Sequence, residues 1–290
     1  MPAEIRLAVW ATGENEAPER GLKPEHIRAE VDETPVGIKS VRGPGSNLIL
    51  LVVMDLTGDP GSIEAARRRL DLHFQEMGDE QYVALLQAQD GLSVVQDPTR
   101  DRAKLSQTLA EMPTAAYPGL LDAVEEAALI GQSMLEGSKV RVAVLFITDG
   151  GIEDYRGDYT NPVVNRSDSR DLSRRFRDRV IQEKISAIDA RLSTISTPLF
   201  FLHLDEEDDT LNVAYQNGIS QFAQTTGGRA AYSRGIAEIP TLLEGLLARI
   251  DDHYSVTIET PAIAEGRLEV RLDAGSRVDL EHRDVLELTP

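Results

Sequence analysis

Two aspartates stand directly after apolar runs that are long enough to be buried strands. Asp55 follows the run 48–54, and Asp149 closes a second run that begins at Val140. Parallel strands covered on both faces consist of uninterrupted Val, Leu and Ile, and open α/β sheets place ligands beyond the carboxyl ends of their strands. We therefore expect Asp55 and Asp149 to converge, either as oxygen ligands of a hard cation or as an aspartyl nucleophile with its helper.

The loop after the first run adds further oxygen ligands. It reads Asp55-Leu56-Thr57-Gly58-Asp59, so one hydroxyl and one more carboxylate lie close to Asp55. Together with Asp149, these side chains could bind Mg²⁺ or Ca²⁺. The alternative is that the carboxylates only cap loops and helix N-termini. The sequence leaves both interpretations open.

The composition narrows the classes of partner. The 290 residues include 49 acidic and 30 basic ones, a formal charge of −19, and no cysteine. Such a charge repels nucleic acid and anionic membranes and attracts divalent cations or basic partners. The absence of cysteine excludes disulfides and thiolate zinc, and the five histidines have no ligand spacing. No run approaches the roughly 20 apolar residues of a membrane span.

The elements that must position Asp55 and Asp149 form an α/β pattern. We predict a Rossmann-like, mostly parallel sheet with helices on both faces, built on the apolar runs 48–54, 140–147 and 198–204. An Asp-Gly turn at 90–91 predicts that 92–95 returns as an antiparallel edge strand. Helical periodicity predicts helices over 172–195 and 213–225.

The two ends of the chain have a different texture from this centre. Segments 1–45 and 253–290 contain short alternating strands separated by turns, and they flank the α/β region 46–252. Neither end has enough strands to bury a face by itself. We therefore expect the N-terminal and C-terminal segments to pack together as one small β-sandwich-like module, with the α/β domain inserted between them.

These motifs and their order resemble the von Willebrand factor type A domain. The pattern Asp55-x-Thr57-x-Asp59 comes first, and Thr148-Asp149-Gly150 follows the later strand. The flanks resemble the bacterial group called VWFA-related. They comprise 21–27 with 30–33 near the N-terminus, Thr-Gly-Gly at 226–228, and the closing hairpin 254–272.

The resemblance implies a metal-ion-dependent adhesion site and a non-enzymatic, adhesion- or scaffold-type protein-binding function. It maps Asp55, Thr57 and Asp149 onto metal ligands, while Asp59 replaces a serine. The second loop departs from the family pattern, because Pro118 stands where a threonine ligand is expected and the nearest threonine is Thr114. The implied site is therefore degenerate, with an unidentified protein as the partner. The resemblance also implies an extracytoplasmic location, although no signal peptide is visible and a cytoplasmic one is compatible.

Two other functions use the same residues. Asp55-Leu-Thr-Gly resembles the aspartyl-phosphate loop of haloacid-dehalogenase-type phosphotransferases, with Asp149 as a second metal carboxylate. Lys184 lies within a predicted helix and the further acidic pair of that family is missing, so this enzyme is the weaker hypothesis. The third hypothesis is a scaffold with a vestigial site.

Three charged features are better explained by solvated surface than by function. Arg156-Gly157-Asp158 matches an integrin-type tripeptide in a predicted loop over 150–171, but so short a motif specifies little. An arginine cluster spans 166–179 and an acidic run spans 205–209. Both read as solvated charge, although the arginines could bind an acidic partner and the acids could widen a cation site.

Overall fold

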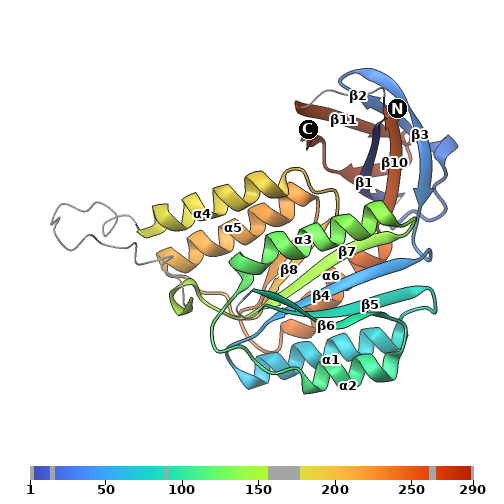
Figure 1. Ribbon diagram of the computed structural model, residues 1–290. Coiled ribbons are helices and arrows are strands. Elements are labelled where there is room, and N and C mark those ends of the chain that lie inside the picture. Colours follow the sequence, from blue (N-terminus) through green and yellow to red (C-terminus); the bar gives the residue numbers. More distant parts are fainter. Residues whose placement is uncertain (1–2, 14–16, 89–90, 156–176, 261–265, 289–290) are drawn as a thin grey trace, which may run out of the picture.

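Two β-sheets make up the fold, one in the α/β centre and one built from both ends of the chain (Figure 1). The computed structural model describes residues 3–13, 17–88, 91–155, 177–260 and 266–288. The strands are β1 Ala3–Thr12, β2 Arg28–Val31, β3 Thr34–Arg42, β4 Leu48–Asp55, β5 Gln81–Ala88, β6 Leu92–Thr99, β7 Arg141–Thr148, β8 Leu199–His203, β9 Ala230–Tyr232, β10 Tyr254–Thr260, β11 Gly266–Asp273, β12 Asp279–His282 and β13 Val285–Leu288. The helices are α1 Pro60–Glu76, α2 Arg102–Glu111, α3 Leu120–Gly137, α4 Arg177–Leu192, α5 Thr210–Thr226 and α6 Ile239–Asp252, with short 3₁₀ turns at Pro24–His26 and Ile152–Asp154.

The central sheet confirms the expected strand pattern. Its order is β6-β5-β4-β7-β8-β9, in which all neighbours are parallel except the antiparallel pair β5–β6. The three apolar runs therefore lie side by side, and the hairpin strand forms one edge. The chain leaves β4 toward β5 on one side and returns as β7 on the other. Asp55 thus lies at the switch point of the strand order, where open α/β sheets bind ligands.

Helices cover both faces of this sheet (Figure 1). Helices α1, α2 and α6 bury side chains such as Leu70, Leu109 and Leu243 against one face, and α3, α4 and α5 cover the other. One helix start differs from the prediction, and a second cannot be compared with it. Helix α5 begins at Thr210 because Asp209 accepts hydrogen bonds from its first free N–H groups. Helix α4 is described only from Arg177, so the predicted residues 172–176 lie outside the described residues.

The chain ends associate as expected, but they do not form a sandwich. Their strands make a single curved antiparallel sheet in the order β12-β1-β10-β3-β2-β11-β13 (Figure 1). Strands from the two ends are interleaved, since β10 pairs with β1 on one side and β3 on the other, and β11 pairs with β2. This continuous pairing joins all seven strands into one sheet. Its curvature encloses a core of its own that includes Val9, Val256 and Val270.

Arg141 ties together the two connections between the sheets. Its side chain is fully buried at the start of β7. One guanidinium nitrogen donates to the carbonyls of Asp251, at 2.7 Å, and His253, at 3.0 Å, and the other donates to the carbonyl of Ser46, at 3.0 Å. The chain enters the α/β unit at Ser46 and leaves it at 251–253. One buried cation therefore fixes the entry and the exit to each other.

Candidate functional site at the strand ends

Asp55 is a fully buried carboxylate with hydrogen bonds to both of its oxygens. The backbone N–H groups of Gly119 and Leu120, at the start of α3, donate to its two oxygens at 2.8 and 3.2 Å. The Thr148 hydroxyl donates from β7 at 2.9 Å. Burial nevertheless raises the pKa of Asp55 to about 7, and the charge of Asp149 contributes to the increase. The hydrogen bonds from the helix N-terminus and the hydroxyl thus favour the ionised carboxylate, but they do not fully compensate for its loss of hydration.

Asp149 organises the loop that follows β4. Its Oδ1 accepts from the Thr57 backbone N–H at 2.6 Å and lies 3.1 Å from the Thr57 hydroxyl, and its Oδ2 accepts from the Gly58 N–H at 2.9 Å. The structure therefore brings Asp55, Thr57 and Asp149 together, as the sequence predicts. The Thr57 hydroxyl, however, is directed toward the Asp149 carboxylate.

Asp59 takes the alternative role of a helix cap. Its Oδ2 accepts from the Ser62 N–H at 2.8 Å, which satisfies one of the free donors at the start of α1. In the second loop, Pro118 is buried against Gly150, where an added Cβ would lie 2.3 Å from the Pro118 Cγ. Thr114 is exposed. Pro118 therefore fills the place of the expected hydroxyl ligand with a ring.

These residues fit a metal poorly in the arrangement that the structure shows. The Asp55 carboxylate accepts hydrogen bonds from the start of α3 and from Thr148, and the Asp149 carboxylate accepts hydrogen bonds from the loop after β4. Asp59 caps α1. Among the described residues, no group of three His, Cys, Asp or Glu side chains is arranged to hold a metal ion. A cation would have to displace hydrogen bonds that stabilise the loops, so the metal site stays a prediction.

Two buried tyrosines extend the Asp55 cluster, and sequence reasoning missed them. The Tyr155 hydroxyl accepts from the Leu121 N–H at 3.2 Å and lies 3.0 Å from the Tyr215 hydroxyl. Burial is the main cause that raises the pKa of both phenols. A fully buried tyrosine needs a polar partner, so Tyr215 on the inward face of α5 was the available signal. Tyr155 lies in the predicted polar loop 150–171, so nothing in the sequence indicates that it is buried.

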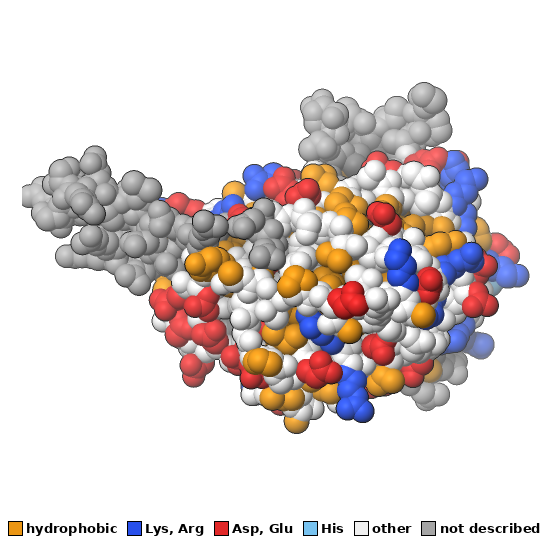
Figure 2. All heavy atoms as spheres, turned by 60° about the horizontal axis from the view of Figure 1, so that its bottom comes forward, with side chains coloured by type: hydrophobic (Ala, Val, Ile, Leu, Met, Phe, Trp, Pro, Cys, Tyr) orange, Lys and Arg blue, Asp and Glu red, His pale blue; other side chains and the backbone are white. Residues whose placement is uncertain are grey.

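The rim of the strand-end face is acidic, with large apolar side chains in several of its loops. The exposed acids comprise Glu153, Asp154, Asp205, Glu206, Asp208 and Asp209. Figure 2 shows acidic side chains gathered at the left end of the molecule, the end to which the parallel strands β4 and β7 of the central sheet point in Figure 1. Tyr117 is 51% exposed, Val213 41% and Ile236 50%. Two loops and the first turn of α5 thus present apolar surface at the same end of the sheet.

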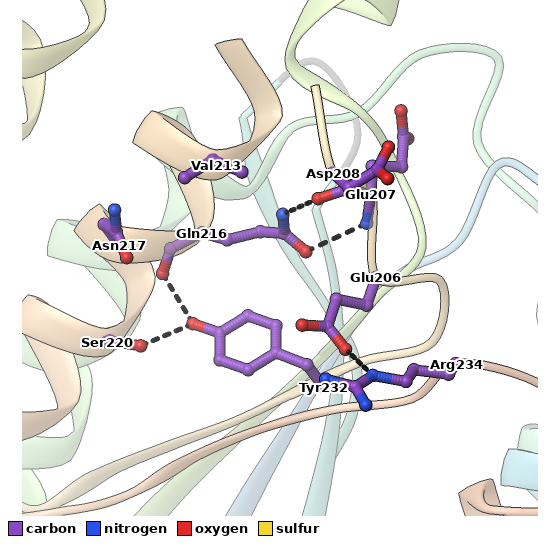
Figure 3. A pocket seen from close by; sticks show the side chains of 9 residues that line it. All are labelled: Glu206, Glu207, Asp208, Val213, Gln216, Asn217, Ser220, Tyr232 and Arg234. Carbon is purple, nitrogen blue, oxygen red and sulfur yellow. Dashed lines mark hydrogen bonds and ion pairs between the residues drawn. The ribbon is translucent and has the colours of Figure 1, made fainter. Parts of the chain in front are cut away.

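A pocket of about 590 Å³ opens in this rim beside α5 (Figure 3). Glu206 and Arg234 form an ion pair of 2.8 Å on one side of it. The Tyr232 hydroxyl donates to the Gln216 carbonyl at 2.5 Å and lies 2.8 Å from the Ser220 hydroxyl. Burial raises the pKa of Tyr232 to about 12, so the phenol is neutral. The pocket has a polar floor that is fixed by internal hydrogen bonds.

Two of the charged features from the sequence fall partly outside the described residues. The tripeptide 156–158 and the arginines from 166 to 175 are not described. Within the described part, Arg179 is exposed and lies 3.3 Å from Glu183 in the next turn of α4, which is an ordinary surface pair. In the acidic run, Asp209 caps α5 and Glu207 accepts from the Asn212 amide at 2.6 Å.

Comparisons with known proteins agree on the fold. Neither models of protein families nor curated proteins match the sequence. A solved von Willebrand factor type A structure from Catenulispora acidiphila matches with a TM-score of 0.52 and 9% identity, over 98% of this chain and 73% of that one. A mutant of the PilB minor pilin from Streptococcus sanguinis matches with a TM-score of 0.50 and 10% identity, over 71% of this chain and 62% of that one. An aerotolerance-related membrane protein from Bacteroides fragilis matches with a TM-score of 0.44 and 12% identity, over 71% and 99%.

The class that these observations define is an α/β fold of the von Willebrand factor type A kind. The comparison with the Catenulispora acidiphila protein extends to the second sheet as well, because it covers nearly the whole chain. In the part of the chain that the structure describes, no helix is both long and apolar enough to cross a membrane.

Proposed function

We propose that this protein is a non-enzymatic protein-interaction module that binds its partner through the strand-end face. The observation that carries the proposal is the combination of exposed Tyr117, Val213 and Ile236 with acidic loops at the switch point of the sheet. Protein-binding surfaces combine apolar anchors with a polar rim. Solved structures with the same fold include a minor pilin and a von Willebrand factor type A protein.

The charge of the face indicates the chemistry of the partner. The chain carries a formal charge of −19, and the exposed acids of the rim lie beside the apolar side chains. Like charges across an interface are unfavourable, and opposite charges accelerate the encounter. The partner that suits this face is a segment with both basic and apolar side chains.

The phosphotransferase hypothesis is less favoured by the position of Asp55. A nucleophilic carboxylate must reach the phosphorus atom, whereas Asp55 is 0% exposed and its oxygens accept hydrogen bonds from Gly119, Leu120 and Thr148. Beryllofluoride trapping followed by intact-mass measurement and a phosphatase assay tests this alternative. A stable adduct on Asp55 would reverse our preference.

The degenerate metal site is part of the same proposal. Partner binding at this face does not require a cation, because hydrogen bonds to Asp55, Asp149 and Asp59 already hold the loops. Any Mg²⁺ or Ca²⁺ bound through Asp55, Thr57, Asp59 and Asp149 would be held weakly. Partner binding should therefore be the same in a divalent cation and in chelator.

A peptide-selection experiment tests the interaction surface. The full chain is immobilised, and binding peptides are selected from a displayed random library in chelator. We expect the selected peptides to be rich in Lys or Arg together with apolar residues. Their affinity should fall at least about 10-fold for the rim variants D205K/D208K and Ile236→Ser, which remove the charge and an apolar anchor.

A matched variant controls for the change of net charge. D97K/E126K changes two exposed acids away from this face, on β6 and α3, by the same four charge units. It should retain the wild-type affinity for the selected peptides. Equal losses in D205K/D208K and D97K/E126K would contradict a specific face, and peptides that bind every variant equally would contradict the proposed function.

An extracytoplasmic location is also a proposal, and it rests on the family resemblance and on neighbours such as the minor pilin. Fractionation of cells that express the natural gene, followed by detection of the chain, tests it. Recovery only with cytoplasmic markers would contradict it.

A further inference from the structure

A second pocket lies at the opposite end of the central sheet, where the two units join. It is formed by the end of α1, the turn that leads into β5 and the two connections between the units. We call it the junction pocket, and its volume is about 400 Å³. Its most important side chains are His73, Asp251, Asp79 and Glu80.

His73 lines this pocket and has a buried ring nitrogen without a hydrogen-bond partner among the described residues. Its side chain is 6% exposed, and within the described part of the chain its Nε2 has no hydrogen-bond partner. Burial, with a smaller effect from Arg69 and Arg102, lowers the pKa of His73 to about 4. The imidazole is therefore neutral near pH 7 and has one nitrogen that can accept a hydrogen bond. Most buried polar atoms are paired, so such a nitrogen calls for an explanation.

Asp251 brings an unpartnered oxygen to the same place. Its Oδ1 is buried and, among the described residues, has no hydrogen-bond partner. Burial raises the pKa of Asp251 to about 6, although the charge of Arg141 acts in the opposite direction. The Arg141 guanidinium donates to the Asp251 backbone carbonyl and does not neutralise the carboxylate by a hydrogen bond. Near pH 7 the group is thus mainly ionised, with acceptor capacity to spare.

The distance between the His73 imidazole and the Asp251 carboxylate indicates which kind of donor group could bind to both. His73 Nε2 and Asp251 Oδ2 lie 3.8 Å apart, which is too long for a hydrogen bond. A single donor atom can lie within hydrogen-bond distance of both. An ammonium nitrogen carries three tetrahedral N–H groups and can donate to two converging acceptors, whereas a planar guanidinium directs its donors along a fixed fork.

The surroundings favour an organic cation over a metal ion. The lining carries five carboxylates, Glu76, Asp79, Glu80, Asp251 and Asp252, against one arginine, Arg20, which pairs with Asp252 at 3.4 Å. Three arginines outside the lining, Arg69, Arg102 and Arg141, also act on His73 or Asp251. Asp79 and Glu80 are exposed at the rim. A metal would need further protein ligands, and no group of three suitable side chains occurs in the described residues.

We propose that the junction pocket binds a primary ammonium group, which donates hydrogen bonds to His73 Nε2 and the Asp251 carboxylate. The carboxylates of Asp79 and Glu80 attract the cation and can receive a second charged group on the same ligand. The ligand is either a small di- or polyamine or a lysine side chain of a protein partner. This site is separate from the strand-end face and does not depend on the function proposed for it.

Calorimetric titration of the full chain at pH 7.5 and constant ionic strength tests the proposal. The probes are putrescine and the peptide acetyl-Gly-Lys-Gly-amide, and tetramethylammonium chloride serves as a cation without N–H donors. We expect saturable binding of at least one amine probe and none of tetramethylammonium. Binding of putrescine alone would identify a small amine, and binding of the peptide alone would identify a lysine side chain.

Two variants and one spectroscopic signal make the result specific. Asp251→Asn and His73→Phe should each weaken amine binding at least about 10-fold, because each removes an acceptor of a charged donor. Asp97→Asn, which removes an exposed carboxylate on β6, should bind as the wild type does. In the wild type, the His73 Cε1–H signal in a carbon–proton NMR spectrum should shift on titration, a readout that needs no variant.

The negative outcomes are equally defined. The proposal is overturned if neither amine binds the wild type with saturation and the His73 signal stays unmoved. It is also overturned if tetramethylammonium reproduces the effect, or if Asp97→Asn loses as much affinity as Asp251→Asn.

Discussion

Burial raises the pKa of both Asp55 and Asp251, yet the surroundings of these two carboxylates differ. At the strand ends, Asp55 is 0% exposed and accepts three hydrogen bonds. At the junction, Oδ1 of Asp251 is buried without a partner among the described residues, and Oδ2 lies 3.8 Å from the unpartnered Nε2 of His73. The first arrangement is complete without a ligand, and the second is not. Hydrogen-bond saturation therefore separates a structural carboxylate from a binding one better than burial or an altered pKa does.

The largest effect is expected from removal of the Asp55 carboxylate. Asp55→Ala leaves the N–H groups of Gly119 and Leu120 and the Thr148 hydroxyl without their acceptor. We expect the free energy of unfolding at pH 6 to fall by about 3 kcal/mol, since each buried polar group left unpaired costs roughly 1–3 kcal/mol. Urea denaturation measures the change. Asp55→Asn, which keeps one acceptor, should recover most of the loss, and an unchanged midpoint for Asp55→Ala would contradict the structural role.

The second effect is the pH dependence that Asp55 imposes. Its pKa rises from 3.8 to about 7 on folding, so the native state holds the proton more tightly than the unfolded state. Stability due to this group is greatest at low pH and falls as the pH rises toward the folded pKa. Between pH 5 and pH 8 the wild type should lose about 2–3 kcal/mol relative to Asp55→Asn. Denaturation of both proteins across this range tests the sign, and parallel pH profiles would refute it.

At the junction, the same kind of substitution should cost little. Asp251→Asn removes a carboxylate whose buried oxygen accepts no hydrogen bond from the described residues. We expect the free energy of unfolding at pH 7.5 to change by less than about 1 kcal/mol, because no donor loses its acceptor. Urea denaturation without added amine checks this. A loss as large as that of Asp55→Ala would show that the two carboxylates play equivalent structural roles.

The smallest effect expected is that of a divalent cation at the strand ends. A cation stabilises the protein only if it binds the native state, and the carboxylates of Asp55, Asp59 and Asp149 already accept hydrogen bonds. We expect about 5 mM Mg²⁺ or Ca²⁺ to stabilise the wild type by less than about 0.3 kcal/mol relative to chelator. Thermal melts of the wild type and Asp55→Asn measure the difference. A larger gain that is confined to the wild type would restore the metal site.

The sequence predicted the central sheet because its signals are local. Uninterrupted apolar runs define β4, β7 and β8, and β6 is the antiparallel edge strand expected after the Asp-Gly pair, whose Asp90 lies outside the described residues. The association of the two ends also followed from strand number alone. The single curved sheet did not, because alternation of β1, β10 and β3 depends on pairing between residues more than 200 positions apart in the chain, such as Arg42 with Ser255.

The strand-end site could be predicted only in part, because its contacts also join distant segments of the chain. The sequence places Asp55 and Asp149 beyond strand ends, and the structure brings them together with Thr57. The sequence does not reveal which groups donate hydrogen bonds to each carboxylate, because these groups come from the starts of α1 and α3, from β7 and from the loop after β4. The junction pocket was outside the reach of motif reasoning, since His73 and Asp251 lie on separate helices and match no ligand spacing.

The interleaving of the two ends within one sheet also sets an order of events during protein synthesis. Strand β10 pairs with both β1 and β3, so the first sheet strands cannot complete their pairing until residue 260 has been made. At roughly 5–20 residues per second, the delay after Arg42 is on the order of 10–40 s. During that interval the α/β unit can fold and bring residues 46 and 253 close together, which shortens the loop that sheet closure must span. The N-terminal strands are therefore the segment most in need of protection by chaperones on the ribosome.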